Sequence, residues 1–245
     1  MDITLLGTGA PGGLPLADCP CARCALALGE DARAATCALV DGALLLDLTP
    51  GAALAAARAG RSLGGVLQVL LSHPHDGPAL TVPPGLPAPG RSPDGEELTL
   101  LSGHRVRALA VDVPGTGYAV TAPDGGRLLY LPPGAGVAGV PRRQAARPRP
   151  YDTVLMDVLG RPDALARLRA AGAVGPQTDV LAVHLGHEAP PGAELRRRLA
   201  AEGARAVADG ASLRAGDAEP PAVPRRTLVL GGARSGKSVE AERRL

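Results

Sequence analysis

The chain has 245 residues, of which 45% are hydrophobic, and a formal net charge of +2 at pH 7, which allows one large domain or two smaller ones with a buried core. No apolar run reaches the ~18 residues of a membrane span and the first residues carry no secretion signal, so we expect a cytoplasmic protein without a membrane span. Because Phe and Trp are absent and only three Tyr occur, the chain lacks aromatic surfaces for stacking bases, and composition argues against nucleic acid as a partner.

Apolar runs bounded by Gly, Pro and Asp predict the elements in chain order. The first part is predicted to hold a helix at 50–58 and strands at 3–7, 38–40, 43–47 and 65–72. A second set of strands is predicted at 98–101, 105–111, 118–121 and 127–131. The last part alternates helices at 162–171 and 191–203 with strands at 153–158, 179–184 and 206–208. Two β-rich halves with flanking helices predict an α/β fold in which two sheets form a sandwich covered by helices.

A loop near the start of the chain carries three closely spaced cysteines. Cys19, Cys21 and Cys24 form a C-x-C-x-x-C pattern within six residues, which suits a tetrahedral metal site and is too tight for a disulfide pair with a spare thiol. A cytosolic location also argues against disulfides. Cys37, inside an apolar run, is predicted to be a small core residue.

Histidines cluster where predicted strands end. His73 and His75 follow the strand at 65–72, and His184 ends the strand at 179–184. Three imidazoles brought to one sheet edge could hold one Zn²⁺. His104 has no partner in the sequence and is predicted to be a surface histidine.

The end of the chain carries a phosphate-binding pattern. A Pro-rich stretch at 214–226 is predicted to be a linker, so the chain divides into a domain at 1–213, the linker, and a segment at 227–245. An apolar run at 227–230 leads into the pattern G-x-x-x-x-G-K-[ST], which binds ATP or GTP with Mg²⁺ through backbone N–H groups, a lysine and a hydroxyl. Its residues are Gly231, Gly232, Ala233, Arg234, Ser235, Gly236, Lys237 and Ser238.

Six segments, in order, resemble the metallo-β-lactamase fold, and within it the cyclic-phosphate phosphodiesterases of phosphonate breakdown. They are 5–13, 45–47, 72–75, 126–130, 152–157 and 183–187. The resemblance implies a four-layer αββα sandwich for residues 1–213. It also implies a structural zinc on the cysteine loop, closed by a histidine three residues after an active-site histidine, which assigns Cys19, Cys21, Cys24 and His187 to that zinc.

The chain departs from this family at the second metal. The family signature is H-x-H-x-D-H, but Gly77 and Pro78 stand at its last two positions. The chain also lacks the histidine expected after residue 111 and the bridging aspartate expected after residue 131. We therefore expect His73, His75 and His184 to form a vestigial or weak site and assign no catalytic residue. Asp76 and Asp112 lie next to the missing positions and could replace the absent metal ligands after a local shift of the chain.

Residues 226–243 resemble the opening of the adenosylcobinamide kinase/adenosylcobinamide-phosphate guanylyltransferase. Under this hypothesis the chain is the amino-terminal part of an enzyme of cobalamin biosynthesis that transfers phosphoryl and GMP groups. Nucleotide and adenosylcobinamide would bind through the remainder of the kinase domain, and the leading domain would be catalytically degenerate. This chain alone would lack a complete kinase site. The alternative is a metal-dependent phosphodiesterase or hydrolase of the metallo-β-lactamase superfamily.

Overall fold

The computed structural model describes residues 1–74, 80–138, 149–217 and 235–243. Its strands form two sheets. The five-stranded sheet has the order β11-β1-β2-β3-β4, with bounds β1 Asp2–Gly7, β2 Cys37–Val40, β3 Leu44–Leu46, β4 Gln68–Leu70 and β11 Ser212–Arg214. The six-stranded sheet has the order β10-β9-β8-β7-β6-β5, with bounds β5 Glu97–Thr99, β6 Arg105–Ala110, β7 Thr116–Thr121, β8 Arg127–Tyr130, β9 Thr153–Met156 and β10 Asp179–Ala182.

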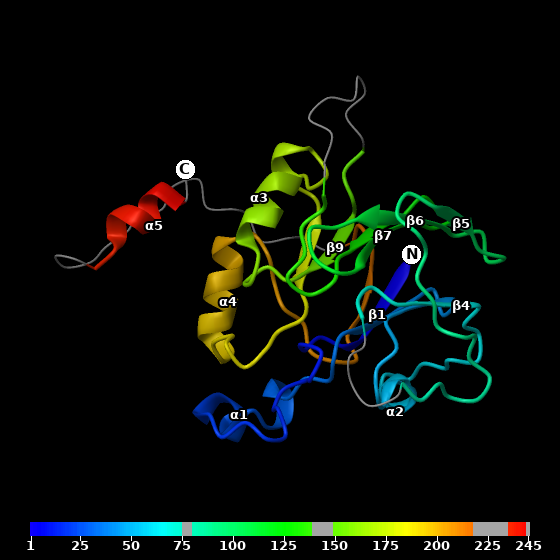
Figure 1. The fold of residues 1–245 in the computed structure, drawn as a ribbon, viewed down its shortest axis with the longest axis horizontal. Helices are drawn as coiled ribbons and strands as arrows, with labels where there is room; N and C mark the ends of the chain where they lie inside the picture. Colours follow the sequence, from blue (N-terminus) through cyan, green and yellow to red (C-terminus); the bar gives the residue numbers. More distant parts are fainter. Residues whose placement is uncertain (75–79, 139–148, 218–234, 244–245) are drawn as a thin grey trace.

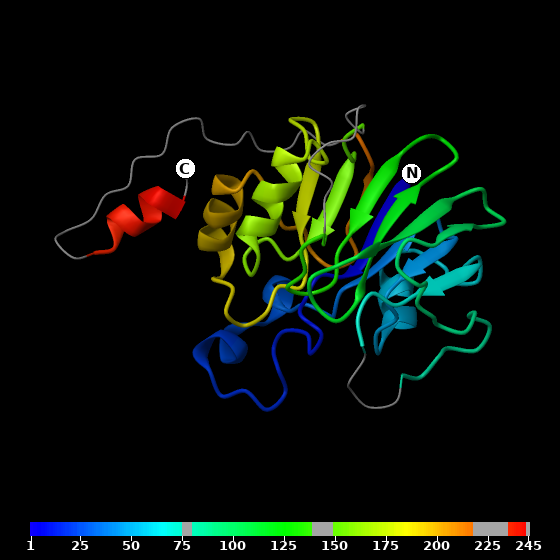
Figure 2. The ribbon, with the colours of Figure 1, turned by 45° about the horizontal axis from the view of Figure 1, so that its top comes forward.

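Helices cover the outer faces of the two sheets. The helices are α1 Ala22–Leu26, α2 Ala52–Arg58, α3 Pro162–Ala170, α4 Gly192–Ala201 and α5 Lys237–Arg243, with a short 3-10 turn at Gly29–Asp31. Figures 1 and 2 show α3 and α4 side by side on one outer face of the sandwich and α2 on the opposite side.

Three apolar clusters match the three interfaces of a four-layer sandwich. The central cluster joins the sheets, with Ile3 and Leu5 of β1 facing Leu128 and Tyr130 of β8. Leu129, between those two β8 residues, points the other way and packs with the residues of α3 and α4. Since successive strand residues face opposite sides, this alternation assigns one face of β8 to the sandwich and the other to the helices. The predicted αββα layering is confirmed.

The turn between β2 and β3 follows its sequence signal. Asp41 and Gly42 have φ angles of 48° and 66°, and positive φ at both central residues is what a tight two-residue hairpin turn requires. Gly7, at the end of β1, meets a different demand. A Cβ there would lie 2.1 Å from the carbonyl oxygen of Ala35, so the neighbouring chain can approach only a glycine.

Three local expectations for residues 1–217 were wrong or incomplete. Residues 206–208 form no strand; the chain continues to Asp209, whose carboxylate accepts bonds from Thr8 Oγ1 at 2.7 Å and from the Ala34 N–H at 2.6 Å. The last strand is instead β11, which pairs antiparallel with β1 and ends one residue past the expected boundary at 213. In the cysteine loop, α1 is an additional helix.

Part of the predicted nucleotide loop lies outside the described residues. This applies to the strand expected at 227–231 and to Gly231, Gly232, Ala233 and Arg234. The described part of the loop consists of Ser235, Gly236, with a φ of 78°, and α5, which begins at Lys237. Within the described ranges, no helix combines the length and apolar character that crossing a membrane would require.

Candidate functional site

The predicted cysteine ligands and His187 come together in space. The Sγ atoms of Cys19, Cys21 and Cys24 lie 3.2, 3.7 and 3.7 Å from His187 Nδ1, and all four ligand atoms lie within 4.8 Å of one another. In a tetrahedral zinc site with ordinary bond lengths, sulfur and nitrogen ligands are separated by roughly 3.6 Å. The four residues therefore fit a zinc ion with a closed ligand shell.

Local structure explains how the thiols converge. Cys21 caps α1, and its Sγ accepts the backbone N–H of Cys24 at 3.4 Å, so the first turn of the helix sets the spacing of these two ligands. This backbone N–H, followed by the Cys19 side chain, lowers the pKa of the Cys21 thiol to about 6. The fourth ligand, His187, has a carboxylate beside its other ring nitrogen. Glu188 Oε1 lies 3.3 Å from His187 Nε2, and a carboxylate in this position keeps a metal-binding imidazole in one orientation.

A buried carboxylate supports His73. Asp47 follows β3 and is 0% exposed. Its Oδ1 accepts the Ser72 N–H at 2.6 Å, and its Oδ2 accepts the hydroxyls of Ser72 and Tyr130, each at 2.6 Å. His73 Nδ1 lies 2.9 Å from Ser72 Oγ and 3.5 Å from Asp47 Oδ2. With Nδ1 engaged here, Nε2 is the nitrogen of His73 that would bind a metal.

His184 lies across from His73 with its ring nearly perpendicular. It follows β10 with a φ of 60°, its N–H donates to Thr36 Oγ1 at 3.0 Å, and its Nε2 lies 3.0 Å from the Leu131 carbonyl oxygen. Burial lowers the pKa of His184 to about 4, so the ring is neutral at pH 7 and keeps the lone pair that a metal ligand needs.

The two histidines face one another at a separation wider than a shared tetrahedral metal requires. Their ring centroids are 6.3 Å apart at 85°, whereas two imidazoles on one tetrahedral zinc have centroids roughly 5.2 Å apart for ordinary bond lengths. The two rings would have to approach one another by about 1 Å to bind one metal ion together. His75, the third expected ligand, lies outside the described residues, as does Asp76.

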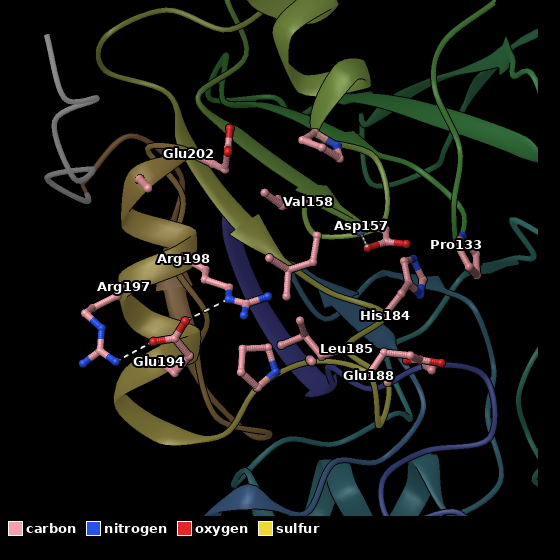
Figure 3. A pocket seen from close by; sticks show the side chains of 18 of the residues that line it. Pro133, Asp157, Val158, His184, Leu185, Glu188, Glu194, Arg197, Arg198 and Glu202 are labelled. Atoms are coloured by element: carbon pink, nitrogen blue, oxygen red, sulfur yellow. Dashed lines mark hydrogen bonds and ion pairs between the residues drawn. The ribbon is translucent and has the colours of Figure 1, made fainter. Parts of the chain in front are cut away.

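A pocket of about 820 Å³ opens beside His184. Figure 3 shows Asp157 and His184 near one another at one end, while Glu194 pairs with Arg197 and Arg198 at the other. Val158 and Leu185 contribute apolar lining between the two ends. The pocket is thus an elongated space with polar ends next to the histidines.

Asp112 does not replace the missing metal ligands. Its carboxylate pairs with Arg161 at 2.8 Å and accepts the Gly136 N–H at 2.7 Å. The Arg161 guanidinium, followed by this backbone bond, lowers the pKa of Asp112 to about 2. Because both oxygens are held by these donors, the hypothesis of a local shift toward the histidines is not supported at Asp112.

His104 is not the surface histidine that its sequence context predicts. Only 3% of it is exposed, its Nε2 lies 2.7 Å from Asp41 Oδ2, and its Nδ1 lies 2.8 Å from Ser102 Oγ. Asp41 belongs to the turn of the other sheet, 63 residues away in sequence, so no local pattern indicates the pairing.

Sequence reasoning gave no role to Asp47, Ser72 or Tyr130. The available signal was a charged residue directly after the apolar run of β3, since a carboxylate in that position is buried only when it is hydrogen-bonded. The partners that satisfy it come from β8 and from the segment after β4, and sequence alone does not place these beside β3.

Solved structures resemble this chain over most of its length. Zn²⁺-bound PqqB from Methylobacterium extorquens has 20% identity and a TM-score of 0.58, covering 87% of this chain and 100% of its own. A diphosphatase from the PhnP family has 19% identity and a TM-score of 0.61, covering 87% and 97%. The metallo-β-lactamase fold protein YhfI from Bacillus subtilis has 14% identity and a TM-score of 0.53, covering 86% and 98%.

These likenesses show the fold alone: the chain has the metallo-β-lactamase fold. No family model matches the sequence, and the comparison with curated proteins gives no match. The structural likenesses lend no support to the kinase resemblance of residues 226–243.

Proposed function

We propose that this chain of metallo-β-lactamase fold is a metal-dependent hydrolase of the metallo-β-lactamase superfamily, acting on phosphoesters with one metal ion held by His73, His75 and His184. The observation that carries the proposal is the buried Asp47 carboxylate. It supports His73 through Ser72 in a position facing His184, with ring centroids 6.3 Å apart. Burying a carboxylate is costly unless hydrogen-bond donors satisfy it; Asp47 has three such donors, and orienting a metal ligand is a use for this arrangement.

The sequence, together with the described residue Asp112, favours one metal over two. Gly77 and Pro78 stand where the family signature has the ligands of a second ion, and Asp112 is paired with Arg161. A bound metal would supply a water of lowered pKa and a positive charge near the substrate oxygens. Burial lowers the pKa of His184 and keeps its ring neutral, and Asp47 holds the Ser72 hydroxyl that contacts His73. Because the second positive charge is missing, we expect turnover to be slow.

The phosphoester class is supported by two features. The PhnP-family diphosphatase has the same fold, and the pocket beside His184 carries Arg197 and Arg198 on its far wall. Arginine side chains suit a substrate with phosphate oxygens. Both arginines are partly neutralised by Glu194, so we expect a substrate with one phosphoester group and an organic body in preference to a polyphosphate.

Hydrolysis of bis-para-nitrophenyl phosphate tests this proposal. Metal-stripped protein is assayed with added Mn²⁺ or Zn²⁺, and we expect a slow, metal-stimulated rate that falls to background in His73→Ala. His104→Gln serves as a control that removes a histidine outside the site. A wild-type rate with metal no higher than that of His73→Ala would favour the vestigial interpretation of the histidines.

We also propose that Cys19, Cys21, Cys24 and His187 hold a structural zinc. The support is the fit of the four ligand atoms to a tetrahedral shell. A site with four protein ligands leaves no open position for a substrate, which separates it from the histidine site in function.

A second candidate function concerns the end of the chain. We propose that residues 227–245 are the start of an adenosylcobinamide kinase/guanylyltransferase domain. The observation that favours it is local: Gly236 has a φ of 78° and α5 begins at Lys237, the order of glycine turn and helix start that the phosphate-binding pattern requires.

A further inference from the structure

The hydroxyl of Tyr130 crosses from one sheet to the other beside the histidines. Tyr130 ends β8 in the six-stranded sheet, and its hydroxyl donates to Asp47 Oδ2 at 2.6 Å. Asp47 follows β3 in the five-stranded sheet, and both residues are 0% exposed. The ring centroids of Tyr130 and His184 are 6.0 Å apart. Tyr130 therefore contacts the support of His73 while lying beside His184.

The donors around Asp47 determine which nitrogen of His73 carries the proton. An ionised carboxylate only accepts hydrogen bonds, and the Ser72 hydroxyl donates its single proton to Asp47 Oδ2 at 2.6 Å. The 2.9 Å contact between Ser72 Oγ and His73 Nδ1 then needs Nδ1–H as its donor. His73 is thereby held as the tautomer whose lone pair is on Nε2, which is the nitrogen available to a metal.

We propose that Tyr130 is a positioning residue for metal binding at His73, a role that rests on the hydrolase function proposed above. Its hydroxyl and that of Ser72 both bond Asp47 Oδ2, so together they fix the rotation of the carboxylate. A fixed carboxylate keeps the Ser72 hydroxyl pointed at Oδ2, and this leaves Ser72 Oγ as an acceptor for His73. Without the tyrosine hydroxyl, Asp47 keeps the Ser72 N–H on Oδ1 and the Ser72 hydroxyl on Oδ2 but loses its second donor on Oδ2. The carboxylate and, through Ser72, the ring of His73 are then held less tightly in one orientation.

The neighbouring strand offers a matched control. Tyr118 of β7 is the cross-strand partner of Tyr130, is also 0% exposed, and also reaches the opposite sheet. Its hydroxyl donates to the Leu71 carbonyl oxygen at 2.8 Å and not to Asp47. Tyr118→Phe and Tyr130→Phe thus each delete one buried hydroxyl, but only the second bonds Asp47 directly; Tyr118 bonds the carbonyl of the peptide group whose N–H donates to Asp47.

The experiment uses the full chain with zinc already bound at the cysteine cluster. Cobalt titration, followed by its visible absorption, measures affinity at the histidines, and ¹⁵N-histidine NMR of the cobalt-free protein reports the Nδ1–H signal of His73. We expect Tyr130→Phe to weaken cobalt binding about 10-fold or more, the range found for lost supports of metal ligands. We also expect its His73 Nδ1–H signal to broaden or shift. Tyr118→Phe, which does not remove a donor to Asp47, should change both by much less.

Two outcomes would overturn the assignment: wild-type affinity and an unchanged His73 signal in Tyr130→Phe, or equal losses in Tyr118→Phe. If Tyr130→Phe does not fold, Ser72→Ala removes the next link and is expected to disturb the same signal; an unchanged signal there also contradicts the proposal. A wild-type protein that shows the Nδ1–H signal but binds no cobalt at the histidines would contradict the hydrolase function, and the signal in Tyr130→Phe would still decide the role of Tyr130.

Discussion

At the scale of single residues, His104 links the two sheets near the start of β3, whereas Asp47 follows the end of that strand. Its Nε2 lies 2.7 Å from Asp41, in the turn between β2 and β3, and its Nδ1 lies 2.8 Å from Ser102, before β6. Asp41 also accepts the N–H of Asp2 at 2.6 Å. One imidazole thus links the first strand, a hairpin turn and the edge of the second sheet.

Replacing His104 is expected to destabilise the fold without affecting zinc. His104→Phe fills the same space but removes the donor to Asp41. Because that carboxylate is exposed and also accepts the Asp2 N–H, water replaces the lost bond, and the expected cost is about 0.5–1.5 kcal/mol. The free energy of unfolding from a urea titration measures this. Ser102→Ala, which removes only the partner of His104 Nδ1, should cost less. Equal urea midpoints for His104→Phe and the wild type would contradict this role.

The residue scale is also where the sequence predicts least. The burial of Cys37 is confirmed because it lies inside an apolar run whose neighbours are themselves buried. The partners of His104 and Asp47 could not be predicted, because His104–Asp41 and Asp47–Tyr130 each join different sheets and Asp47–Ser72 joins segments 25 residues apart. A local pattern of hydrophobicity does not indicate which turns or strands distant in the sequence contact one another.

At the scale of elements, the segment after β10 connects the two candidate metal sites. His184 and His187 lie three residues apart in it, and Leu185 between them is fastened to the first loop of the chain. Its N–H donates to the Thr8 carbonyl at 3.1 Å, and its carbonyl accepts the Ala10 N–H at 3.1 Å. A zinc on His187 and the three cysteines would hold the same loop from its other side.

We expect one zinc per chain to survive dialysis, about one equivalent, because among the described residues only the cysteine cluster has a closed four-ligand shell. The variant Cys21→Ser/Cys24→Ser should lose it. Its Tm should fall by roughly 5 °C or more, since a closed zinc site contributes several kcal/mol to stability. Elemental analysis and thermal unfolding measure the two effects.

Cys37→Ala is the control for this double variant. Cys37 is fully buried in the core beside α2 and lies outside the cluster, so its replacement should keep the zinc. Two tightly held metals in the wild type, or unchanged metal content in the double variant, would contradict the assignment.

Most strands and helices could be predicted because each has an apolar face of the right period. β8 alternates between the sandwich core and the helix layer, and the buried residues Ala164, Leu165 and Leu168 follow the helical spacing of α3. The segment at 206–208 and β11 were not distinguished, because both are short. β11, with one half-buried residue between two exposed ones, is held by its pairing with β1.

At the scale of the whole molecule, the strands of the sandwich leave none for a nucleotide-binding sheet. All described strands belong to these two sheets, which face one another and are covered on part of their outer faces by helices. A phosphate-binding loop works between a strand and a helix that a parallel sheet holds in place. The segment at 227–245 would need that sheet from elsewhere.

We therefore expect the 245-residue chain to bind Mg·GTP or Mg·ATP weakly, with a Kd above ~100 µM, because no described strand is left to hold the loop in a parallel sheet. Isothermal titration of the wild type and Lys237→Ala tests this. Micromolar binding by the wild type, abolished in Lys237→Ala, would show a competent site within the 245 residues.

The placement of the tyrosines also gives the protein an intrinsic spectroscopic signal near the candidate histidine site. The chain has three Tyr and no Trp, and two of the three are the paired Tyr118 and Tyr130 between the sheets, one bonded to the carbonyl of Leu71 and the other to Asp47. Two of the three tyrosine chromophores therefore lie beside the candidate histidine site. Changes in the near-ultraviolet absorbance of the unlabelled protein will report events at that site, with Tyr151 as the other contributor.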